Sequence, residues 1–274
     1  MTVVFITSGF AFGKYLLFAV SCNPSQKSEL EIGSMKESQE VPSQPVSLVT
    51  GVDKFMPSFL FDLDGTLVDS VYQHVLAWCE ALEKTGIELS IWRIHRRIGM
   101  SGSLFVNALF REIGRDIAPE DADRMRRLHT EAYAKLTKDI RPLPGARELL
   151  RYLSKNRVPY AIATSGRMES ARPTLKLLEL DSQIPIITRD QVRYAKPNPD
   201  LFLAAAEQLN VPITNCVVVG DSIWDLLAAR RARALGVGLL SGGYGQEELE
   251  KSGAYRVYQD PLDLLKHLDE VGVR

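Results

Sequence analysis

Cysteine is scarce in this 274-residue chain, and its three cysteines are too far apart to act in one site. Cys22, Cys79 and Cys216 show no CxxC spacing, so the sequence offers neither a disulfide framework nor a zinc site. Chains that depend on disulfides are typical of oxidising compartments, and this chain shows no such dependence. We therefore expect a reduced, intracellular environment.

Neither sign of charge is in excess. The chain carries 33 Lys and Arg residues against 34 Asp and Glu residues, which gives a formal net charge of -1. A strong positive field is what attracts nucleic acid or an anionic membrane surface. The short basic clusters of this chain lie in helix-like segments, and we interpret them as solvated helix faces. We expect no nucleic-acid partner and no stable membrane association.

A long uninterrupted hydrophobic run is also missing. Residues 3–20 are largely apolar but are broken by polar residues and glycines, whereas a membrane span needs about 20 apolar residues. No positive charge opens this segment, as a secretory signal would require. Ala19-Val20-Ser21-Cys22 resembles a lipoprotein cleavage site, so export or lipid anchoring is the alternative to the cytoplasmic location that we predict. Residues 23–50 are rich in Ser, Gln, Glu and Pro, and residues 1–55 are expected to be an extension, disordered or untranslated, outside the fold.

What the chain does contain is a hydrophobic fraction of 45%, enough for one sizeable core and a smaller second domain. An apolar strand is predicted over residues 58–63, and helical spacing follows from 70 to 141. Beyond Gly145, helices and strands alternate, which is typical of a parallel sheet covered by helices. We predict an α/β fold, a Rossmann-like doubly wound parallel sheet with an inserted all-helical cap. The core domain is assigned residues 56–69 and 142–274, and the cap domain residues 70–141.

Four acidic residues fall where the carboxyl ends of two strands are expected. Asp62 and Asp64 are alternate residues at the end of the strand predicted over residues 58–63, so both carboxylates are expected to face one site. Asp221 ends a strand predicted over residues 216–219, and Asp225 lies one helical turn later on the same helix face. Because ligands bind beyond the carboxyl ends of parallel strands, we expect the four carboxylates to form one nest. Oxygen ligands of this kind suit Mg²⁺, and a cation relieves the repulsion between close carboxylates.

Two further positions at strand ends can hold a phosphate group. Thr164 and Ser165 follow the strand predicted over residues 159–163, where a hydroxyl and backbone N–H groups could bind phosphate oxygens. Lys196 precedes Pro197-Asn198-Pro199, and these prolines restrict its backbone, which suits a fixed positive charge. A carboxylate nucleophile, a cation site, a lysine and a second carboxylic acid together indicate phosphoryl transfer.

These residues also carry a resemblance to a known family. The segments DLDGTLVDS, ATSG, KPNPDLF and GDSIWD, which begin at Asp62, Ala163, Lys196 and Gly220, resemble in the expected order the motifs of the haloacid dehalogenase superfamily of phosphohydrolases. The resemblance implies Asp62 as the nucleophile and Asp64 as the general acid/base. It implies Thr164 and Lys196 as ligands of the transferring phosphoryl group. For Mg²⁺ it implies the following ligands: Asp62, the backbone carbonyl of Asp64, Asp221 and, through water, Asp225.

The helical segment after Asp69 resembles the cap of the subgroup that contains phosphoglycolate phosphatase and β-phosphoglucomutase. Such a cap closes over the site and selects the substrate. Specificity residues in that subgroup lie in a loop that corresponds here to residues 98–103, which includes Met100 and Ser101, although its glycines could equally mark a plain turn. Arg97 and Arg167 are the cations expected nearest the mouth of the site.

The function expected from this resemblance is hydrolysis of a small phosphate monoester through an aspartyl-phosphate on Asp62, in a monomer or weak dimer. A haloacid dehalogenase lacks the second aspartate of the first motif, so Asp64 argues against dehalogenation. A β-phosphoglucomutase-like sugar phosphomutase is the first alternative, although Ile98-Gly99 stands where mutases usually carry Arg-Gly. A non-catalytic phosphate- and magnesium-sensing protein on the same scaffold is the remote alternative, because fold alone does not fix function.

Overall fold

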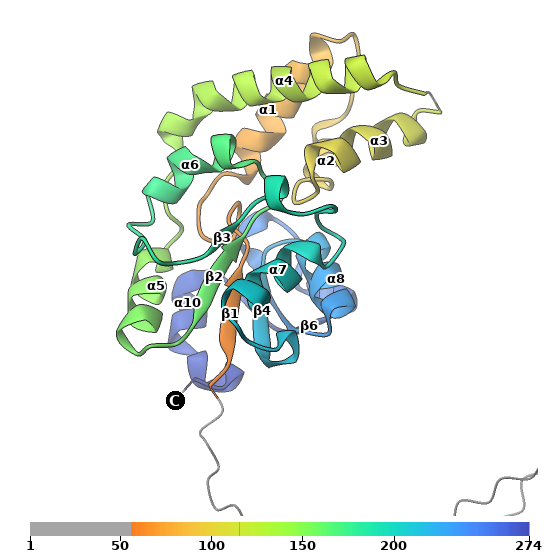
Figure 1. Ribbon diagram of the computed structural model, residues 1–274. Coiled ribbons are helices and arrows are strands. Elements are labelled where there is room, and N and C mark those ends of the chain that lie inside the picture. The colour runs from red at the N-terminus through yellow and green to blue at the C-terminus, as the bar shows by residue number, and fades with distance from the viewer. Residues whose placement is uncertain (1–55, 115, 274) are drawn as a thin grey trace, which may run out of the picture. The chain divides into compact units, whose positions relative to one another are not determined.

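The computed structural model describes residues 56–114 and 116–273, and the expectation for residues 1–55 lies outside the described residues. Six strands form one parallel sheet in the order β3-β2-β1-β4-β5-β6 (Figure 1). The strands are β1 (Ser58–Phe61), β2 (Tyr160–Ala163), β3 (Ile186–Ile187), β4 (Cys216–Gly220), β5 (Leu235–Leu239) and β6 (Ala254–Tyr258). The helices that accompany the sheet are α5 (Ala146–Lys155), α6 (Met168–Lys176), α7 (Asp200–Gln208), α8 (Ile223–Ala232), α9 (Gln246–Ser252) and α10 (Pro261–Lys266). The prediction of an α/β fold with a Rossmann-like parallel sheet is confirmed.

The side chains of β1 explain why helices cover both faces of the sheet. Phe59 and Phe61 belong to one apolar cluster with Leu149 of α5, whereas Leu60 belongs to another with Phe202 of α7. Successive side chains on a strand point to opposite faces, so a strand covered on both sides is apolar throughout. All four residues of β1 are buried accordingly.

The first strand ends at Phe61, two residues earlier than the sequence pattern predicts. The Asp62 N–H still donates to the carbonyl of Val219 on β4, but the chain then folds into a compact turn. Backbone hydrogen bonds across this turn, together with Gly65 at a φ of +84°, replace the expected strand geometry. Asp62 and Asp64 therefore do not alternate on one strand, and the argument that both face one site for that reason is wrong.

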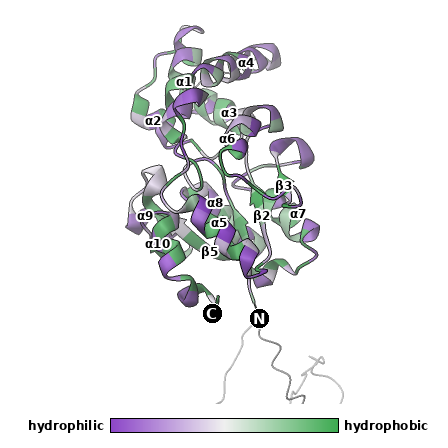
Figure 2. Cartoon of the chain, turned by 90° about the vertical axis from the view of Figure 1, so that its left-hand side faces the viewer, coloured by the Kyte–Doolittle hydropathy of each residue, from purple (hydrophilic) through white to green (hydrophobic). Residues whose placement is uncertain are grey.

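Four helices between β1 and α5 form the cap, which lies beyond the carboxyl ends of the strands (Figure 1). They are α1 (Val71–Glu83), α2 (Ile91–His95), α3 (Gly102–Glu112) and α4 (Pro119–Leu136), and a 3₁₀ turn, Thr137–Asp139, follows. The cap has its own apolar cluster, which includes Trp78 and Phe105. Figure 2 shows hydrophilic residues along α4, whose sequence is rich in charged side chains. Within the described residues, no helix combines the length and the apolar character that crossing a membrane requires.

The cap contacts the core through the turn that follows α2. The backbone carbonyl of Arg96 accepts hydrogen bonds from Trp224 Nε1 at 3.2 Å and from the Tyr244 hydroxyl at 2.8 Å. The Arg96 guanidinium pairs with Glu248 and lies 4.1 Å from the centre of the Tyr244 ring. His95 Nε2 donates to the carbonyl of Gly242 at 2.8 Å. These contacts, which we call the cap–core contact, hold the cap over the carboxyl ends of β1 and β4.

Candidate active site

Three of the four predicted acidic residues form one buried cluster. Asp62 follows β1, Asp221 follows β4, and Asp225 lies in the first turn of α8. Each offers a carboxylate oxygen within 4.8 Å of the other two. The strands β1 and β4 are direct neighbours in parallel register, which brings their carboxyl ends, and these side chains, together.

Each carboxylate of the cluster has fixed partners. Thr66 Oγ1 donates to Asp221 Oδ1 at 2.9 Å, and the Ser222 N–H donates to Asp225 Oδ2 at 3.1 Å. The fully buried Lys196 forms ion pairs with Asp62 and with Asp225 Oδ1, the latter at 2.8 Å. Among the described groups, the Lys196 ammonium is therefore the partner of Asp225 Oδ1. The cluster thus contains three carboxylates and one lysine.

The electrostatics of the cluster are those of a site that lacks positive charge. Burial, together with Asp225 and Asp64, raises the pKa of Asp62 to about 7 although Lys196 lowers it. Burial and the neighbouring carboxylates Asp225 and Asp62 also raise the pKa of Asp221 well above its usual range. Burial alone would lower the pKa of Lys196, but the two facing carboxylates outweigh this and raise it. Buried like charges of this kind are compatible with ionisation when a cation joins them.

Glycine lets the backbone approach this cluster closely. A Cβ on Gly65 would lie 2.5 Å from Asp221 Oδ2, and one on Gly242 would overlap the same carboxylate. Two backbone segments therefore pass against the cluster without side chains of their own. Three carboxylates against one lysine, oxygen atoms as the available ligands and this close backbone fit a divalent cation.

Asp64 turns away from the cluster and toward the cap. Its Oδ1 accepts a hydrogen bond from Ser70 Oγ at 2.6 Å and lies 3.3 Å from His74 Nε2. Burial alone would raise the pKa of Asp64, but His74 and Ser70 outweigh it and lower that pKa. The expected nest of four carboxylates is therefore a cluster of three, with the fourth carboxylate in a separate polar setting beside the same cavity.

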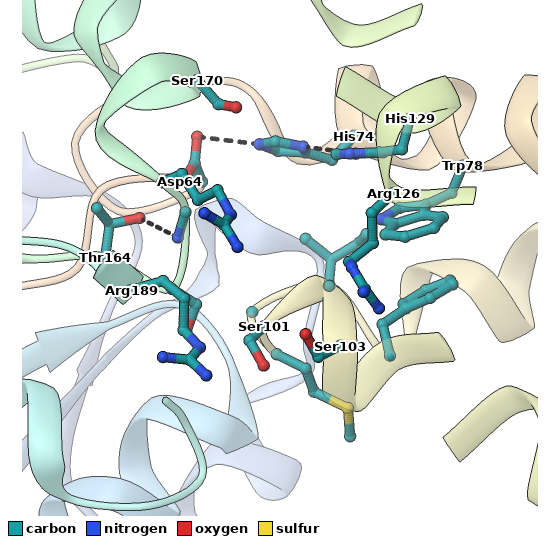
Figure 3. Close-up of a pocket in the computed structure, with 18 of the residues that line it drawn as sticks. Asp64, His74, Trp78, Ser101, Ser103, Arg126, His129, Thr164, Ser170 and Arg189 are labelled. Carbon is teal, nitrogen blue, oxygen red and sulfur yellow. Dashed lines mark hydrogen bonds and ion pairs between the residues drawn. The ribbon is translucent and has the colours of Figure 1, made fainter. Parts of the chain in front are cut away.

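The neighbours of Asp64 continue into the cap (Figure 3). His74 Nδ1 lies 3.2 Å from His129 Nε2, and the His74 ring stacks on Tyr133 with centroids 3.9 Å apart. Burial and the neighbouring His74 lower the pKa of His129 well below its usual range. Sequence reasoning missed both histidines. The position of His74 one helical turn after Ser70 could have indicated that it lies near the site. His129 lies 55 residues further on, and nothing in the sequence connects it with the site.

The predicted phosphate-binding residues lie on the other side of Asp62. Thr164 directly follows β2, the neighbour of β1, and Thr164 Oγ1 accepts a hydrogen bond from the Gly166 N–H at 3.0 Å. The Ser165 hydroxyl is buried and has no hydrogen-bond partner among the described residues. A polar group that is buried without a partner is costly in a folded protein. The hydroxyl is therefore suited to a ligand that enters the adjacent cavity.

A cavity of about 150 Å³ separates the cap from these strand ends. Asp62, Asp64, Thr164 and Ser165 line it, and so do the four residues predicted to contact substrate, Arg97, Met100, Ser101 and Arg167. Lys196 does not line it but forms an ion pair with Asp62, which does. Arg97 pairs with Glu112 of the cap, and the largely exposed Arg167 pairs with Asp190 at 3.0 Å. Sequence reasoning missed Arg126 and Arg189, which also line the cavity.

Comparison with known proteins identifies the family to which this site belongs. The haloacid dehalogenase-like hydrolase family matches residues 56–233. The chain belongs to this haloacid dehalogenase-like hydrolase family. A hydrolase of known crystal structure from Pseudomonas syringae is 58% identical, with a TM-score of 0.77 over 78% of this chain and 99% of that one.

Named relatives of this family member include a phosphatase and a mutase. Hexitol phosphatase A of Escherichia coli (strain K12) is 37% identical over 166 residues, which cover 60% of this chain and 74% of that protein. β-Phosphoglucomutase of Bacillus subtilis (strain 168) is 28% identical over 218 residues, which cover 78% of this chain and 93% of that protein. The resemblance drawn from the sequence motifs is confirmed, as is the enzyme class, a phosphoric monoester hydrolase of the haloacid dehalogenase-like family.

Within this family member, the arrangement can support both halves of a phosphoryl transfer. A buried carboxylate on Asp62 faces the cavity beside a cluster suited to a cation, and Asp64 stands beside the same cavity with a separate network of proton-bearing groups. Two carboxylates whose surroundings move their pKa values in opposite directions are suited to different tasks.

Proposed function

We propose that this chain is a magnesium-dependent phosphatase that hydrolyses a small phosphate monoester through an aspartyl-phosphate on Asp62. The observation that carries the proposal is the buried cluster of Asp62, Asp221 and Asp225 with Lys196, at the end of a cavity whose wall includes Thr164. This cluster places a carboxylate nucleophile beside a lysine and a site suited to a cation. Phosphoryl transfer requires positive charge of this kind beside the nucleophile.

Asp62 is proposed as the nucleophile. One of its carboxylate oxygens attacks phosphorus, and the bond between phosphorus and the ester oxygen of the alcohol breaks. Lys196 orients this carboxylate through the ion pair that holds it. Thr164 and Ser165 are proposed to bind the phosphoryl oxygens, and the partnerless hydroxyl of Ser165 supports this role.

Asp64 is proposed as the general acid/base. Its pKa is below the usual range in this structure, so the carboxylate is ionised before the substrate arrives. A phosphate monoester has a second pKa of about 6 and can bring the proton, which Asp64 then passes to the departing alcohol oxygen. Asp64, ionised again, next takes a proton from water, whose oxygen attacks phosphorus and releases Asp62 and inorganic phosphate. His74 and Ser70 hold the carboxylate in position for both transfers.

Asp62, Asp221, Asp225 and the backbone carbonyl of Asp64 are proposed to hold the magnesium ion, with Asp225 acting through water. When bound, the ion supplies positive charge that keeps Asp62 ionised and offsets the charge of the phosphoryl oxygens. The excess of three carboxylates over one lysine and the raised pKa values of Asp62 and Asp221 support a cation at this place.

The substrate is proposed to be a small phosphorylated metabolite, and Arg97, Met100, Ser101 and Arg167 are proposed to contact it. Hexitol phosphatase A and β-phosphoglucomutase are named for phosphorylated carbohydrates, which supports a compound of this size. We also propose that the chain acts in the cytoplasm as a monomer or weak dimer. Its scarce cysteines support the cytoplasmic location.

The test is release of inorganic phosphate from a panel of esters, measured with magnesium and with excess chelator. The panel contains phosphoglycolate, hexose and hexitol phosphates and an aryl phosphate, and β-glucose 1-phosphate is also checked for conversion to the 6-phosphate. We expect magnesium-dependent release that is abolished in Asp62→Asn, because an amide is a poor nucleophile, and that is retained when the exposed Asp139 is changed to Asn. Conversion without release would replace the phosphatase by a mutase, and release by Asp62→Asn would refute the covalent mechanism.

A further inference from the structure

The core wall of the cavity carries Arg167 and Arg189 as well as its carboxylates, whereas the described part of the cap wall carries arginines and no carboxylate. Among the described residues that line it, the carboxylates are Asp62 and Asp64, and both belong to the core. The cap wall contributes Arg97 and Arg126, while His129 stays neutral at physiological pH. The described side chains that the cap presents to the cavity thus include cations and no carboxylate. The carboxylate partners of the two arginines, Glu112 and Asp123, do not line the cavity.

The two cap arginines are not equivalent. Arg97 has a side chain only 15% exposed, and its guanidinium pairs with Glu112 and donates to the carbonyl of Arg93 at 2.5 Å. Its charge is thus compensated inside the cap. Arg126 pairs instead with Asp123, whose side chain is 57% exposed and lies on the same helix. An exposed pair of this kind contributes little free energy, so an anion in the cavity can replace Asp123 at low cost.

The position of Arg126 is set by its neighbours rather than by that pair. Its methylene groups pass over Gly102, where a Cβ would lie 3.6 Å from Arg126 Cγ and Cδ and 3.5 Å from Trp78 Cζ2. The stem of Arg126 thus packs beside the first residue of α3 at ordinary contact distance. Figure 3 shows the side chain extending from α4 past Trp78 toward Ser103. Arg126 thus lines the cavity with its stem packed beside Gly102 and Trp78.

We propose that Arg126 determines substrate specificity by binding an anionic oxygen group at the end of the substrate farthest from the transferred phosphoryl group. This inference rests on the proposed phosphatase function. A guanidinium presents a planar set of N–H donors that matches a carboxylate or a phosphate in two parallel hydrogen bonds. At a partly enclosed protein wall such bonds are stronger than in bulk water, and a neutral hydroxyl gains less from them than an anion does.

The test uses two esters that differ only at the far end of the molecule. Gluconate 6-phosphate ends in a carboxylate, and glucitol 6-phosphate ends in a hydroxymethyl group on the same carbon skeleton. We expect the wild-type kcat/KM to favour the carboxylate ester, and Arg126→Ala to lower that preference about tenfold, which corresponds to about 1.4 kcal/mol. Arg126→Lys, which keeps the stem over Gly102, retains part of the preference. The matched control Arg127→Ala, an exposed arginine on the same helix, leaves it unchanged.

A binding measurement separates this inference from the function on which it rests. Both esters are titrated calorimetrically into Asp62→Asn and into the same protein that also carries Arg126→Ala, since neither turns the ester over. A preference for gluconate 6-phosphate that disappears with Arg126 supports the inference. Equal losses for both esters, or no loss, overturn it even if the wild type hydrolyses phosphate esters. If the wild type hydrolyses none, the phosphatase proposal fails, and the titration still decides whether Arg126 binds the anionic group.

Discussion

Replacement of Asp62 by asparagine should change how the stability of the metal-free protein depends on pH. The pKa of Asp62 is raised to about 7 in the folded protein, from an ordinary value of 3.8. Between these two pKa values the folded state binds a proton that the unfolded state has lost, so the free energy of unfolding falls as pH rises. A difference of about three pKa units, at about 1.36 kcal/mol per unit, amounts to about 4 kcal/mol over this range.

The assay is urea denaturation of the wild type and of Asp62→Asn in excess chelator, at several pH values between about 4 and 8. Asparagine does not titrate, so the variant should gain stability relative to the wild type across this range by an amount approaching about 4 kcal/mol. Parallel stability curves would refute the reasoning, because they would mean that burial of Asp62 imposes no penalty on its ionised form.

Magnesium provides the matching control. A cation that binds the ionised carboxylates stabilises the folded state by mass action, so added magnesium should stabilise the wild type more at about pH 8 than at about pH 5. The same addition should stabilise Asp62→Asn less, since one anionic ligand is gone. Equal stabilisation of both proteins at both pH values would show that the ion binds elsewhere.

Lys196→Met should destabilise the metal-free protein by about 3–5 kcal/mol near pH 8, because it leaves the facing carboxylates of Asp62 and Asp225 buried without their cation. Urea denaturation checks this, and a loss below about 1 kcal/mol would contradict it. His74→Gln should move the limb of the pH profile of kcat/KM that Asp64 governs to higher pH, since His74 lowers the pKa of Asp64. An unmoved limb would mean that His74 does not act on Asp64. Tyr244→Phe removes a hydrogen bond of the cap–core contact, about 1 kcal/mol, and should raise KM about fivefold, whereas an unchanged KM would exclude a role for that contact in substrate binding.

The acidic cluster could be predicted from the sequence because it depends on local pattern and on one topological rule. Asp62 and Asp221 each follow an apolar run, and in a parallel sheet such runs end at the same edge. The direct pairing of β1 with β4 then makes the two side chains neighbours. The interpretation of Lys196 as a fixed cation agrees with its position, although its complete burial depends on packing that proline spacing does not reveal.

The rest of the site could not be predicted because it depends on how helices pack. Asp64 was expected to join the cluster, but a turn after Phe61 ends the strand and sends its carboxylate toward His74 instead. His129 and Arg126 lie on α4, and only the packing of α4 on α1 and α3 brings them to the cavity. Helical periodicity identifies which residues of α4 share a face, but it does not say which neighbouring helix that face meets.

One consequence follows from the place of Trp224 in the chain. This tryptophan lies between Asp221 and Asp225, and its indole N–H is bound by the Arg96 carbonyl of the cap. The turn of chain that carries two carboxylates of the cluster is therefore also a point where the cap is attached. Lifting the cap breaks that hydrogen bond, so we expect occupancy of the cluster and a docked cap to favour one another. By thermodynamic reciprocity, a substrate that keeps the cap docked increases ion affinity by the same factor as the ion increases substrate affinity.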